Sequence, residues 1–281
     1  MNDRFMAALL ALFVRAYHSD GNGVKIFDDY AAKSLLSAEE CRQIPGYLLA
    51  GMNAVNKHSG LSSEEALKKL VNRYFAPSIL AISVFCEASL ERAVKIGAEQ
   101  YINIGSGYDT FFCRQPLWAS GIEIFELEDY RIIYDKRKRI SAAGLTVPNN
   151  VYFIGAEENM SDCPRFLSSN LAFSARKRSF VCVPYMTTAF SKENFQKLLL
   201  NMRDFLAHGS TVLFDYPNEF VPGGYTYDEL EIMLSKYGLN IYEHLTRPDI
   251  MGEYFSDYNN ENPDEPISAP ANMNYCLAVV Q

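Results

Sequence analysis

From residue 100 onward, short apolar segments alternate with helical ones, and this alternation limits the possible folds more than any other feature of the chain. The segments that have the length and composition of strands are 100–104, 122–127, 150–154, 179–183, 210–215, 239–244 and 275–280. Helical patterns at 192–206 and 227–237 lie between some of them. Strands that alternate with helices predict a mostly parallel sheet that is covered on both faces. The last two strands follow each other without a clear helix, which predicts an antiparallel pair at the end of the sheet.

The first hundred residues have helical patterns instead. Apolar residues recur at spacings of three and four over 5–17, 28–37 and 38–51. We therefore expect residues 1–98 to form an N-terminal helical cap and residues 99–281 to form the α/β domain, the two together making one compact unit.

Local signals mark the ends of two further helices in this cap. Ser62 and Glu65 have the spacing of a capping box, in which each side chain accepts a hydrogen bond from the backbone of the other residue. Pro77 is expected to start the next helix, and Gly97 to end it. Near the other end of the chain, residues 256–272 are polar and are expected to form a mobile loop.

Composition excludes several classes of protein. The chain has 281 residues, of which 48% are hydrophobic, so it can bury a large core and is neither disordered nor a coiled coil. Its 34 acidic residues outnumber its 26 basic ones, which argues against a nucleic-acid binder. We expect neither a nucleic acid nor a membrane as a partner.

The cysteines and histidines point to a reducing compartment and to no metal site. The 6 cysteines include no Cys-x-x-Cys pair, and the 4 histidines lie far apart. The apolar run 5–14 could pass for the core of a secretory signal, but Arg15 follows it directly and no small-residue cleavage site is present. A buried helix is the favoured interpretation of this run, and we expect a cytoplasmic protein without a bound metal.

The sharpest motif is a glycine loop at the end of the first strand. Gly105-Ser106-Gly107 follows the strand 100–104 and precedes Tyr108, Asp109 and Thr110. Glycines at this position let the backbone approach a ligand at the carboxyl edge of an open α/β sheet. A dinucleotide fingerprint would have a third glycine where Thr110 stands, so a nicotinamide-dependent oxidoreductase is disfavoured.

An acidic cluster follows the glycine loop by about twenty residues. Glu126-Leu127-Glu128-Asp129 ends the second strand, and a carboxylate there can accept hydrogen bonds from both hydroxyls of a ribose. The glycine loop and the acidic strand end together predict a site for a nucleoside-containing cofactor.

These motifs carry a resemblance to a known family. The segment 100–114, the acidic segment 125–128 and Lys136 resemble the leucine carboxyl methyltransferases, which are class I enzymes dependent on S-adenosylmethionine. The segment 26–35 is similar to the family's N-terminal segment, which helps to cover the active site, and the chain from Tyr227 to its end fits the family's last helix and two strands.

The resemblance implies a fold, a cofactor and an activity. The fold would be a Rossmann-like class I methyltransferase sheet of about seven strands, mostly parallel with an antiparallel last strand, plus the helical cap. The cofactor would be S-adenosyl-L-methionine. The activity would be O-methylation of a carboxylate or hydroxyl of a small molecule or peptide, by an enzyme that could form a homodimer.

Site residues follow from the same resemblance. It implies that the cofactor contacts residues in the glycine loop, at the acidic strand end and after strands three and four: Gly105, Ser106, Gly107, Tyr108, Asp109, Glu128, Asp129, Glu157 and Pro184. Glu128 would bind the ribose hydroxyls. Glu157 is either an adenine-side contact or a solvated loop acid.

The chain also departs from the family at three cofactor contacts. Ile82-Ser83-Val84 stands where the family has an arginine that meets the cofactor's carboxylate, and Arg73 or Arg92 could replace it. Residues 155–158 replace the family's Asp-Leu, and Pro184-Tyr185 replaces its Glu. A non-catalytic relative that uses the fold for binding or dimerisation is therefore the alternative.

Methyl transfer requires mainly that the acceptor and the methyl group be held in line. A carboxylate acceptor needs no base, whereas a hydroxyl does. Apart from His244 in the strand 239–244, no histidine adjoins the carboxyl end of a strand, which favours an anionic acceptor or a base supplied by tyrosine. Of the aromatic residues near strand ends, Tyr185 is the candidate catalytic residue. The basic run 136–139 is interpreted as a solvated helix face.

Overall fold

The computed structural model describes residues 3–55, 62–156, 162–185 and 191–281. Its centre is a seven-stranded sheet in the order β3-β2-β1-β4-β5-β7-β6. The strands are β1 (Gln100–Ile104), β2 (Glu123–Asp129), β3 (Val151–Ala156), β4 (Ser179–Val183), β5 (Thr211–Pro217), β6 (Leu239–Leu245) and β7 (Met273–Val280). Neighbours among β1 to β5 pair in parallel, and β7 runs antiparallel to both β5 and β6. The predicted fold class is confirmed.

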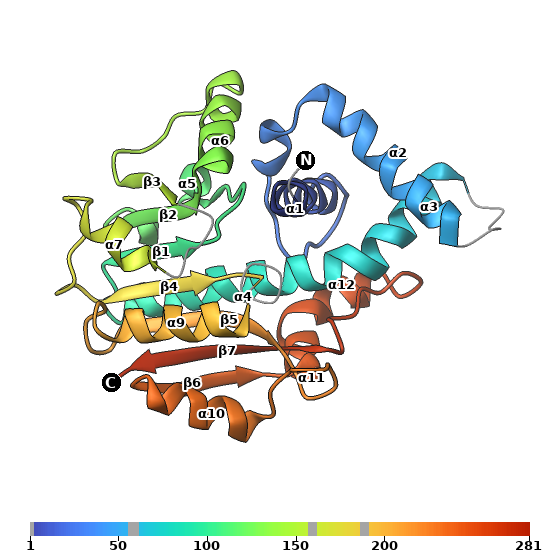
Figure 1. The fold of residues 1–281 in the computed structure, drawn as a ribbon. Helices are drawn as coiled ribbons and strands as arrows, with labels where there is room; N and C mark the ends of the chain where they lie inside the picture. The colour runs from blue at the N-terminus through green and yellow to red at the C-terminus, as the bar shows by residue number, and fades with distance from the viewer. Residues whose placement is uncertain (1–2, 56–61, 157–161, 186–190) are drawn as a thin grey trace.

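Helices cover both faces of this sheet, as Figure 1 shows with α4 behind the strands and α9 and α10 in front. On one face pack α1 (Asp3–Ser19), α4 (Ala76–Lys95) and α6 (Tyr130–Ala142). On the other face pack α7 (Cys163–Ser168), α9 (Lys192–Arg203) and α10 (Tyr227–Lys236). Burial on both sides explains why every residue of β1 and β4 is buried and why both strands are rich in apolar residues.

The N-terminal region contains α1, α2 (Ala38–Val55) and α3 (Ser63–Leu70). The capping box predicted for Ser62 and Glu65 is present. Pro77 lies in the first turn of α4, as predicted, but α3 and α4 are joined through a π-helical turn, Val71–Phe75, into one helix. Proline is tolerated there because a first-turn N–H needs no helical partner and the π turn shifts the hydrogen-bond pattern.

Two predictions about the cap and the tail are wrong. Only Ala32–Leu35 of the segment 28–37 is helical, as a short 3-10 helix, because Asp29 points inward to ion pairs instead of following a helical surface. The segment 256–272, predicted as a loop, begins with α12 (Ser256–Glu261). This helix follows α11 (Arg247–Ile250) and a π-helical turn, and it forms because Phe255 and Tyr258 bury their rings at helical spacing.

The prediction that the basic run 136–139 is a solvated face holds for Arg137 and Lys138, which are exposed, but is wrong for Lys136 and Arg139. Lys136 is fully buried and pairs with Glu126, which is 1% exposed at its side chain. Arg139 pairs with Glu40 (2.6 Å) and with Asp135 (2.5 Å). The run occupies four directions around α6, so two of its members face the protein while the others face outward.

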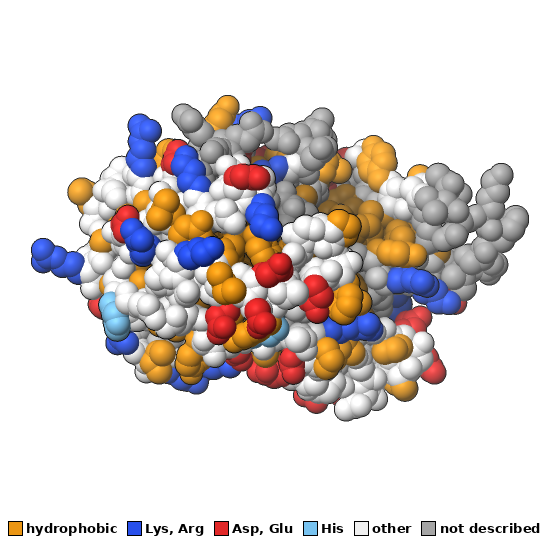
Figure 2. All heavy atoms as spheres, turned by 60° about the horizontal axis from the view of Figure 1, so that its bottom comes forward, with side chains coloured by type: hydrophobic (Ala, Val, Ile, Leu, Met, Phe, Trp, Pro, Cys, Tyr) orange, Lys and Arg blue, Asp and Glu red, His pale blue; other side chains and the backbone are white. Residues whose placement is uncertain are grey.

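The surface and the long helix add two facts about possible partners. Figure 2 shows a face on which basic and acidic side chains are interspersed among hydrophobic ones. The helix Ser63–Lys95 is long and apolar enough to cross a membrane by composition, but 56% of its most apolar window is buried inside the protein. A core helix passes the same test, so the composition of this helix does not distinguish the two.

Candidate functional site

The glycine loop turns sharply at the carboxyl end of β1. Gly105 and Gly107 have φ angles of 82° and 51°, which glycine adopts at little cost and other residues rarely adopt. Gly105 N donates to Leu127 O at 2.8 Å, so the loop is held against the end of β2. A Cβ atom at Gly107 would lie 3.2 Å from Ala8 Cβ of α1. The loop therefore lies between the sheet edge and α1.

Asp109 fixes the far end of this loop. Its Oδ1 accepts from Thr110 N (2.7 Å) and Phe111 N (3.2 Å), at the start of α5 (Phe111–Arg114). Its Oδ2 accepts from Asn103 Nδ2 at 2.9 Å. Asp109 thus lies at the turn from the loop into α5, and its role as a cofactor contact stays a prediction.

The predicted ribose acid, Glu128, is buried and already has three donors. Gly107 N donates to Oε2 at 2.9 Å, Asp129 N donates to Oε1 at 2.7 Å, and Arg4 Nε of α1 lies 3.0 Å from Oε1. A carboxylate has about four acceptor positions, so one position remains for the two hydroxyls of a ribose. Ribose binding through both hydroxyls therefore requires Arg4 to leave.

The neighbouring predicted residues have structural contacts. Asp129 accepts from Arg131 N at 2.8 Å and so caps α6. Tyr108 donates its hydroxyl to Asp135 at 2.6 Å, and its ring packs edge-on against Phe5. Glu157 lies outside the described residues.

A small cavity adjoins the glycine loop, between β1, β4, α4 and α1. Four of the predicted site residues line it: Ser106, Asp109, Pro184 and Tyr185. Its volume is about 50 Å³, room for a few water molecules but far below the roughly 300–1,000 Å³ of typical ligand pockets. A cofactor with a nucleoside can enter only if part of the cover moves, and α1 is the element that contacts both Gly107 and Glu128.

Arg15 of α1 also lines this cavity, although its local sequence predicts only the end of an apolar helical run. Its guanidinium is buried and donates to Asp29 Oδ2 (2.9 Å) and to Tyr108 O (2.8 Å). The sequence signal for Arg15 was its place directly after an apolar helical run. A charged residue that is buried at such a place needs hydrogen-bond or ion-pair partners. The candidates Arg73 and Arg92 do not line the cavity, and Arg92 instead pairs with Glu243 at 2.7 Å.

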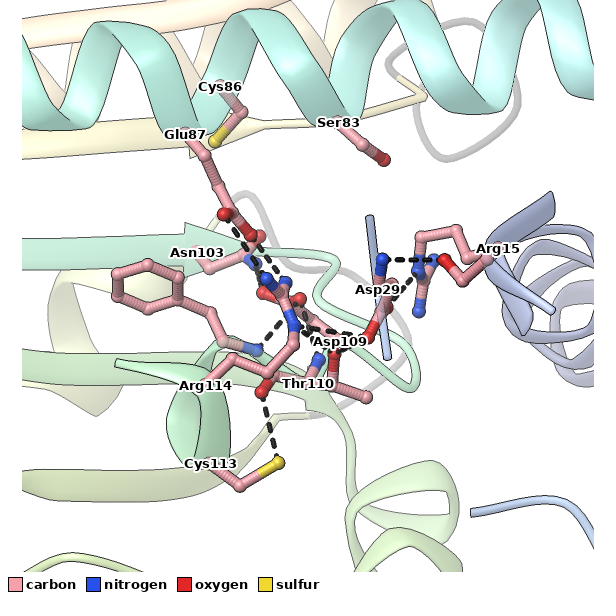
Figure 3. A network of polar contacts seen from close by, with 12 residues as sticks. Arg15, Asp29, Ser83, Cys86, Glu87, Asn103, Asp109, Thr110, Cys113 and Arg114 are labelled. Atoms are coloured by element: carbon pink, nitrogen blue, oxygen red, sulfur yellow. Dashed lines mark hydrogen bonds and ion pairs between the residues drawn. The ribbon is translucent and has the colours of Figure 1, made fainter. Parts of the chain in front are cut away.

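A buried charge network joins Arg15 to α4 and α5, as Figure 3 shows. Arg114 lies 3.0 Å from Asp29 Oδ1 and 2.5 Å from Glu87 Oε1. Burial opposes ionisation of Asp29, but Arg15 and Arg114 outweigh it and lower the pKa of Asp29. Burial raises the pKa of Glu87 despite the opposing effect of Arg114. The network fastens α1 and the segment after it to the glycine loop.

Tyr185 follows β4 and has a strained backbone. Its φ is 58°, the only positive φ at a non-glycine residue among those described, and such strain is often found at functional sites. Burial raises the pKa of Tyr185 to about 12, with Arg15 opposing and Asp215 of β5 adding to the shift. The phenol is therefore protonated at neutral pH and can donate a hydrogen bond into the cavity.

Comparison with known proteins identifies the class. A family model described as leucine carboxyl methyltransferase matches residues 8–202. YktD of Bacillus subtilis (strain 168), provisionally named an S-adenosyl-L-methionine-dependent methyltransferase, is 28% identical over 308 aligned positions that cover 99% of this chain and 98% of YktD. The chain belongs to the leucine carboxyl methyltransferase family. It is an S-adenosylmethionine-dependent methyltransferase, and the predicted class of enzyme and its cofactor are confirmed.

Several solved structures are similar to this chain at low sequence identity. Residues 961–1257 of StiE, described as an O-MT, are 10% identical with a TM-score of 0.48, covering 80% of this chain and 84% of that one. Magnesium protoporphyrin IX methyltransferase from Synechocystis PCC 6803, solved with bound S-adenosylmethionine, is 7% identical with a TM-score of 0.43, covering 80% and 86%.

The residues present fit this cofactor at its amino-acid end. Asn103 Oδ1 is buried and has no hydrogen-bond partner among the described residues, and Asn103 lines the cavity together with Arg15. An acceptor without a donor and a guanidinium beside it suit a zwitterionic group. The ribose end fits only after Arg4 has left Glu128.

Proposed function

We propose that this protein transfers a methyl group to a carboxylate oxygen of a small molecule or peptide. The observation that supports a carboxylate over a hydroxyl is the protonated Tyr185. Among the described residues that line the cavity there is no histidine, and Tyr185 keeps its proton at neutral pH, so neither a histidine nor a tyrosinate base is available there for a hydroxyl acceptor. A carboxylate, with a reference pKa near 4, is already ionised and needs no base.

The roles proposed for the predicted residues follow from their positions. S-adenosylmethionine supplies an electrophilic methyl group when bound. Gly105, Ser106 and Gly107 present the backbone to it, and Pro184 shapes the floor after β4. Glu128 binds the ribose once Arg4 has left. Tyr108, Asp109 and Asp129 hold the loop and the start of α6 in place, and Glu157 remains a proposed adenine-side contact.

Tyr185 is proposed to orient the acceptor by donating its hydroxyl hydrogen to a carboxylate oxygen. A donor fixes the oxygen that attacks and leaves its charge largely intact, whereas a base would remove a proton that a carboxylate lacks. The proposed catalytic contribution of the chain is therefore positioning and the exclusion of water.

The test uses the chemical difference between esters and ethers. The protein is incubated with methyl-labelled S-adenosylmethionine and a panel of carboxylic acids, each matched with the alcohol of the same skeleton. We expect label to appear with acids and to be released as volatile methanol by mild alkali. Base-stable label on the alcohols would contradict the carboxylate proposal. Cofactor binding without turnover on any acceptor would favour the non-catalytic alternative.

Three partner and location proposals accompany this function. We propose that the protein acts in the cytoplasm, binds neither nucleic acid nor membrane, and can form a homodimer. The composition supports the first two, because acidic residues outnumber basic ones, 34 to 26, and the scattered cysteines suit a reducing compartment. All 6 cysteines are free thiols in the structure.

A further inference from the structure

A second cavity lies beside the first turns of α9, apart from the cavity at the glycine loop. Its volume is about 320 Å³, within the range of roughly 300–1,000 Å³ that is typical of ligand pockets. Its walls come from the start of α9, the end of β5, the loop 218–224 and the start of β7. The two cavities share no lining residue. The methyl transfer proposed above therefore leaves this second cavity without a role.

Hydrogen bonds within the loop hold the walls of the second cavity in place. Gly224 N donates to Val221 O at 2.8 Å, and Tyr225 N donates to Pro217 O at 2.9 Å, so the loop folds back on the end of β5. A Cβ atom at Gly224 would collide with the carbonyl oxygen of Asn218, so this close turn requires glycine. A cavity with such walls is formed before a ligand enters, which lowers the entropic cost of binding.

The lining of the second cavity is largely apolar and has a single charge. Phe195, Val221 and Met273 contribute apolar side chains. Of the described residues that line the cavity, Lys192 is the one with a charged side chain, and none is acidic. The chain as a whole has a formal net charge of −8, so a cavity whose lining is positive stands out from the rest of the protein and favours an anion.

Lys192 keeps its charge available for a ligand. Its Nζ lies 4.2 Å from the centre of the Tyr225 ring. Within the part of the chain that the structure describes, Lys192 forms no ion pair, and its acidic neighbour Glu193 does not line the cavity. An ammonium group has three N–H donors, and the ring face contacts only one side of it. One positive charge balances the single charge of a carboxylate and only half the charge of a phosphate dianion.

The second cavity lies at the same edge of the sheet as the glycine loop. It is lined by Pro217 and Met273, which are paired at the end of β5 and the start of β7. Val183 of β4 is paired with Phe214 of β5, so Pro184 lies two residues behind the level of Pro217. With the usual strand spacing and rise, Pro184 and Pro217 are about 8 Å apart. A ligand in the second cavity is therefore a neighbour of the proposed transfer site.

We propose that the second cavity binds an apolar monocarboxylic acid, with the carboxylate at Lys192 and the hydrocarbon against Phe195, Val221 and Met273. An apolar body suits the walls, and a single negative charge suits the one cation at their rim. The proposal depends on this cavity alone and on neither the cofactor nor the proposed methyl acceptor.

The test uses octanoate and octan-1-ol, which share a hydrocarbon chain and differ in charge. Calorimetry measures both dissociation constants with the protein saturated with S-adenosylhomocysteine, so that the cofactor site is occupied. We expect octanoate to bind about three- to tenfold more tightly than octan-1-ol. Lys192→Ala should abolish this preference and leave the affinity for octan-1-ol within about twofold. Lys197→Ala, which removes a cation of the same helix that pairs with Asp162 outside the cavity, is the matched control and should keep the preference.

A second variant tests the position of the hydrocarbon. Val221→Trp fills the cavity with a larger side chain and should weaken the binding of both ligands by about fivefold or more. Lys192 is exposed and Val221 is half-buried, so both variants should fold, which circular dichroism checks.

Several outcomes would overturn the proposal. Octanoate that fails to bind the unmodified protein, or that binds only when S-adenosylhomocysteine is left out, would exclude a site in the second cavity. A Lys192→Ala variant that keeps the preference for octanoate would exclude the carboxylate contact, and unchanged binding of both ligands by Val221→Trp would exclude the hydrocarbon contact. No methyl donor is present in these measurements, so a failure of the proposed carboxylate methylation would leave them unchanged.

Discussion

Single residues around Glu128 decide whether this acid is free for the ribose contact that we propose for it. Glu128 lies near the end of β2, and it is 2% exposed. Its carboxylate already has two backbone donors and the Arg4 side chain. The two backbone donors are part of the loop and strand end, whereas Arg4 is a long side chain that can swing away.

Arg4→Ala should therefore strengthen cofactor binding. Removing the competing guanidinium frees an acceptor position on Glu128, and we expect the dissociation constant of S-adenosylhomocysteine to fall about two- to fivefold by calorimetry. Arg42→Ala, at an exposed pair with Glu39, is the control. Weaker binding by Arg4→Ala would show that Arg4 is itself a cofactor contact.

Tyr185 gives a prediction about pH. With a pKa of about 12, its phenol stays protonated from pH 7 to 10, so kcat on a carboxylate substrate should be flat over that range. A base of this pKa would instead make kcat rise about tenfold per pH unit. Tyr185→Phe should lower kcat by roughly tenfold because one positioning hydrogen bond is lost. A rising pH profile that Tyr185→Phe abolishes would show that the tyrosine acts as a base.

At the scale of elements, α1 and α6 carry more of the site than their amphipathic patterns indicate. Arg4 in the first turn of α1 contacts Glu128, and Arg15 in a later turn contacts the Tyr108 carbonyl after the glycine loop. Helix α6 inserts Lys136 under the acidic strand end, where it meets Glu126 between the rings of Phe112 and Phe153. Both helices therefore connect charged residues across the core.

The buried pair of α6 and β2 should be sensitive to loss of one partner. Lys136→Met leaves Glu126 buried without its cation and should cost about 3–5 kcal/mol of unfolding free energy at pH 8. Burial already raises the pKa of Glu126 to about 7, above its ordinary value of 4.5, and loss of Lys136 raises it further. Since the folded state then favours the protonated acid, stability falls as pH rises, and the variant should be less impaired at pH 5 than at pH 8.

Urea unfolding at the two pH values measures this effect. The double variant Lys136→Met with Glu126→Gln removes both charges and should recover most of the loss. If the single variant were equally stable at both pH values, Glu126 would not be the group responsible.

For the molecule as a whole, the division into a helical cap of residues 1–98 and an α/β domain of residues 99–281 remains a prediction. One continuous hydrophobic cluster contains residues of α1 and α4 together with β1, β4 and β7. A shared core of this kind couples the folding of its parts.

We therefore expect the chain to unfold in one cooperative transition. Trp118 is the single tryptophan of the chain, and it packs near Phe111. Because it lies beyond residue 98, its fluorescence reports on the α/β part. Far-UV circular dichroism reports on all helices, including the cap. The two urea transitions should coincide within error. Separate transitions would show that the cap unfolds independently.

Several features could be predicted from the sequence because each depends on neighbours along the chain. Continuous apolar runs such as 179–183 predict buried parallel strands, glycines 105 and 107 permit the turn at the sheet edge, and Ser62 with Glu65 caps a helix. The cofactor class followed from the glycine loop, the acidic strand end and the family resemblance.

Tertiary structure alone decided which charges meet. Arg15 and the Tyr108 carbonyl are 93 residues apart, Arg139 and Glu40 are 99 apart, and Arg4 at the start of the chain reaches Glu128 at the end of β2. A charged residue has the same local pattern whether it faces water or a buried partner, because its preference depends on what the rest of the fold brings to it. The sequence by itself therefore determined the sheet, the glycine loop and the class of enzyme, while the fold decided that α1 both covers Glu128 and brings Arg15 to the cavity.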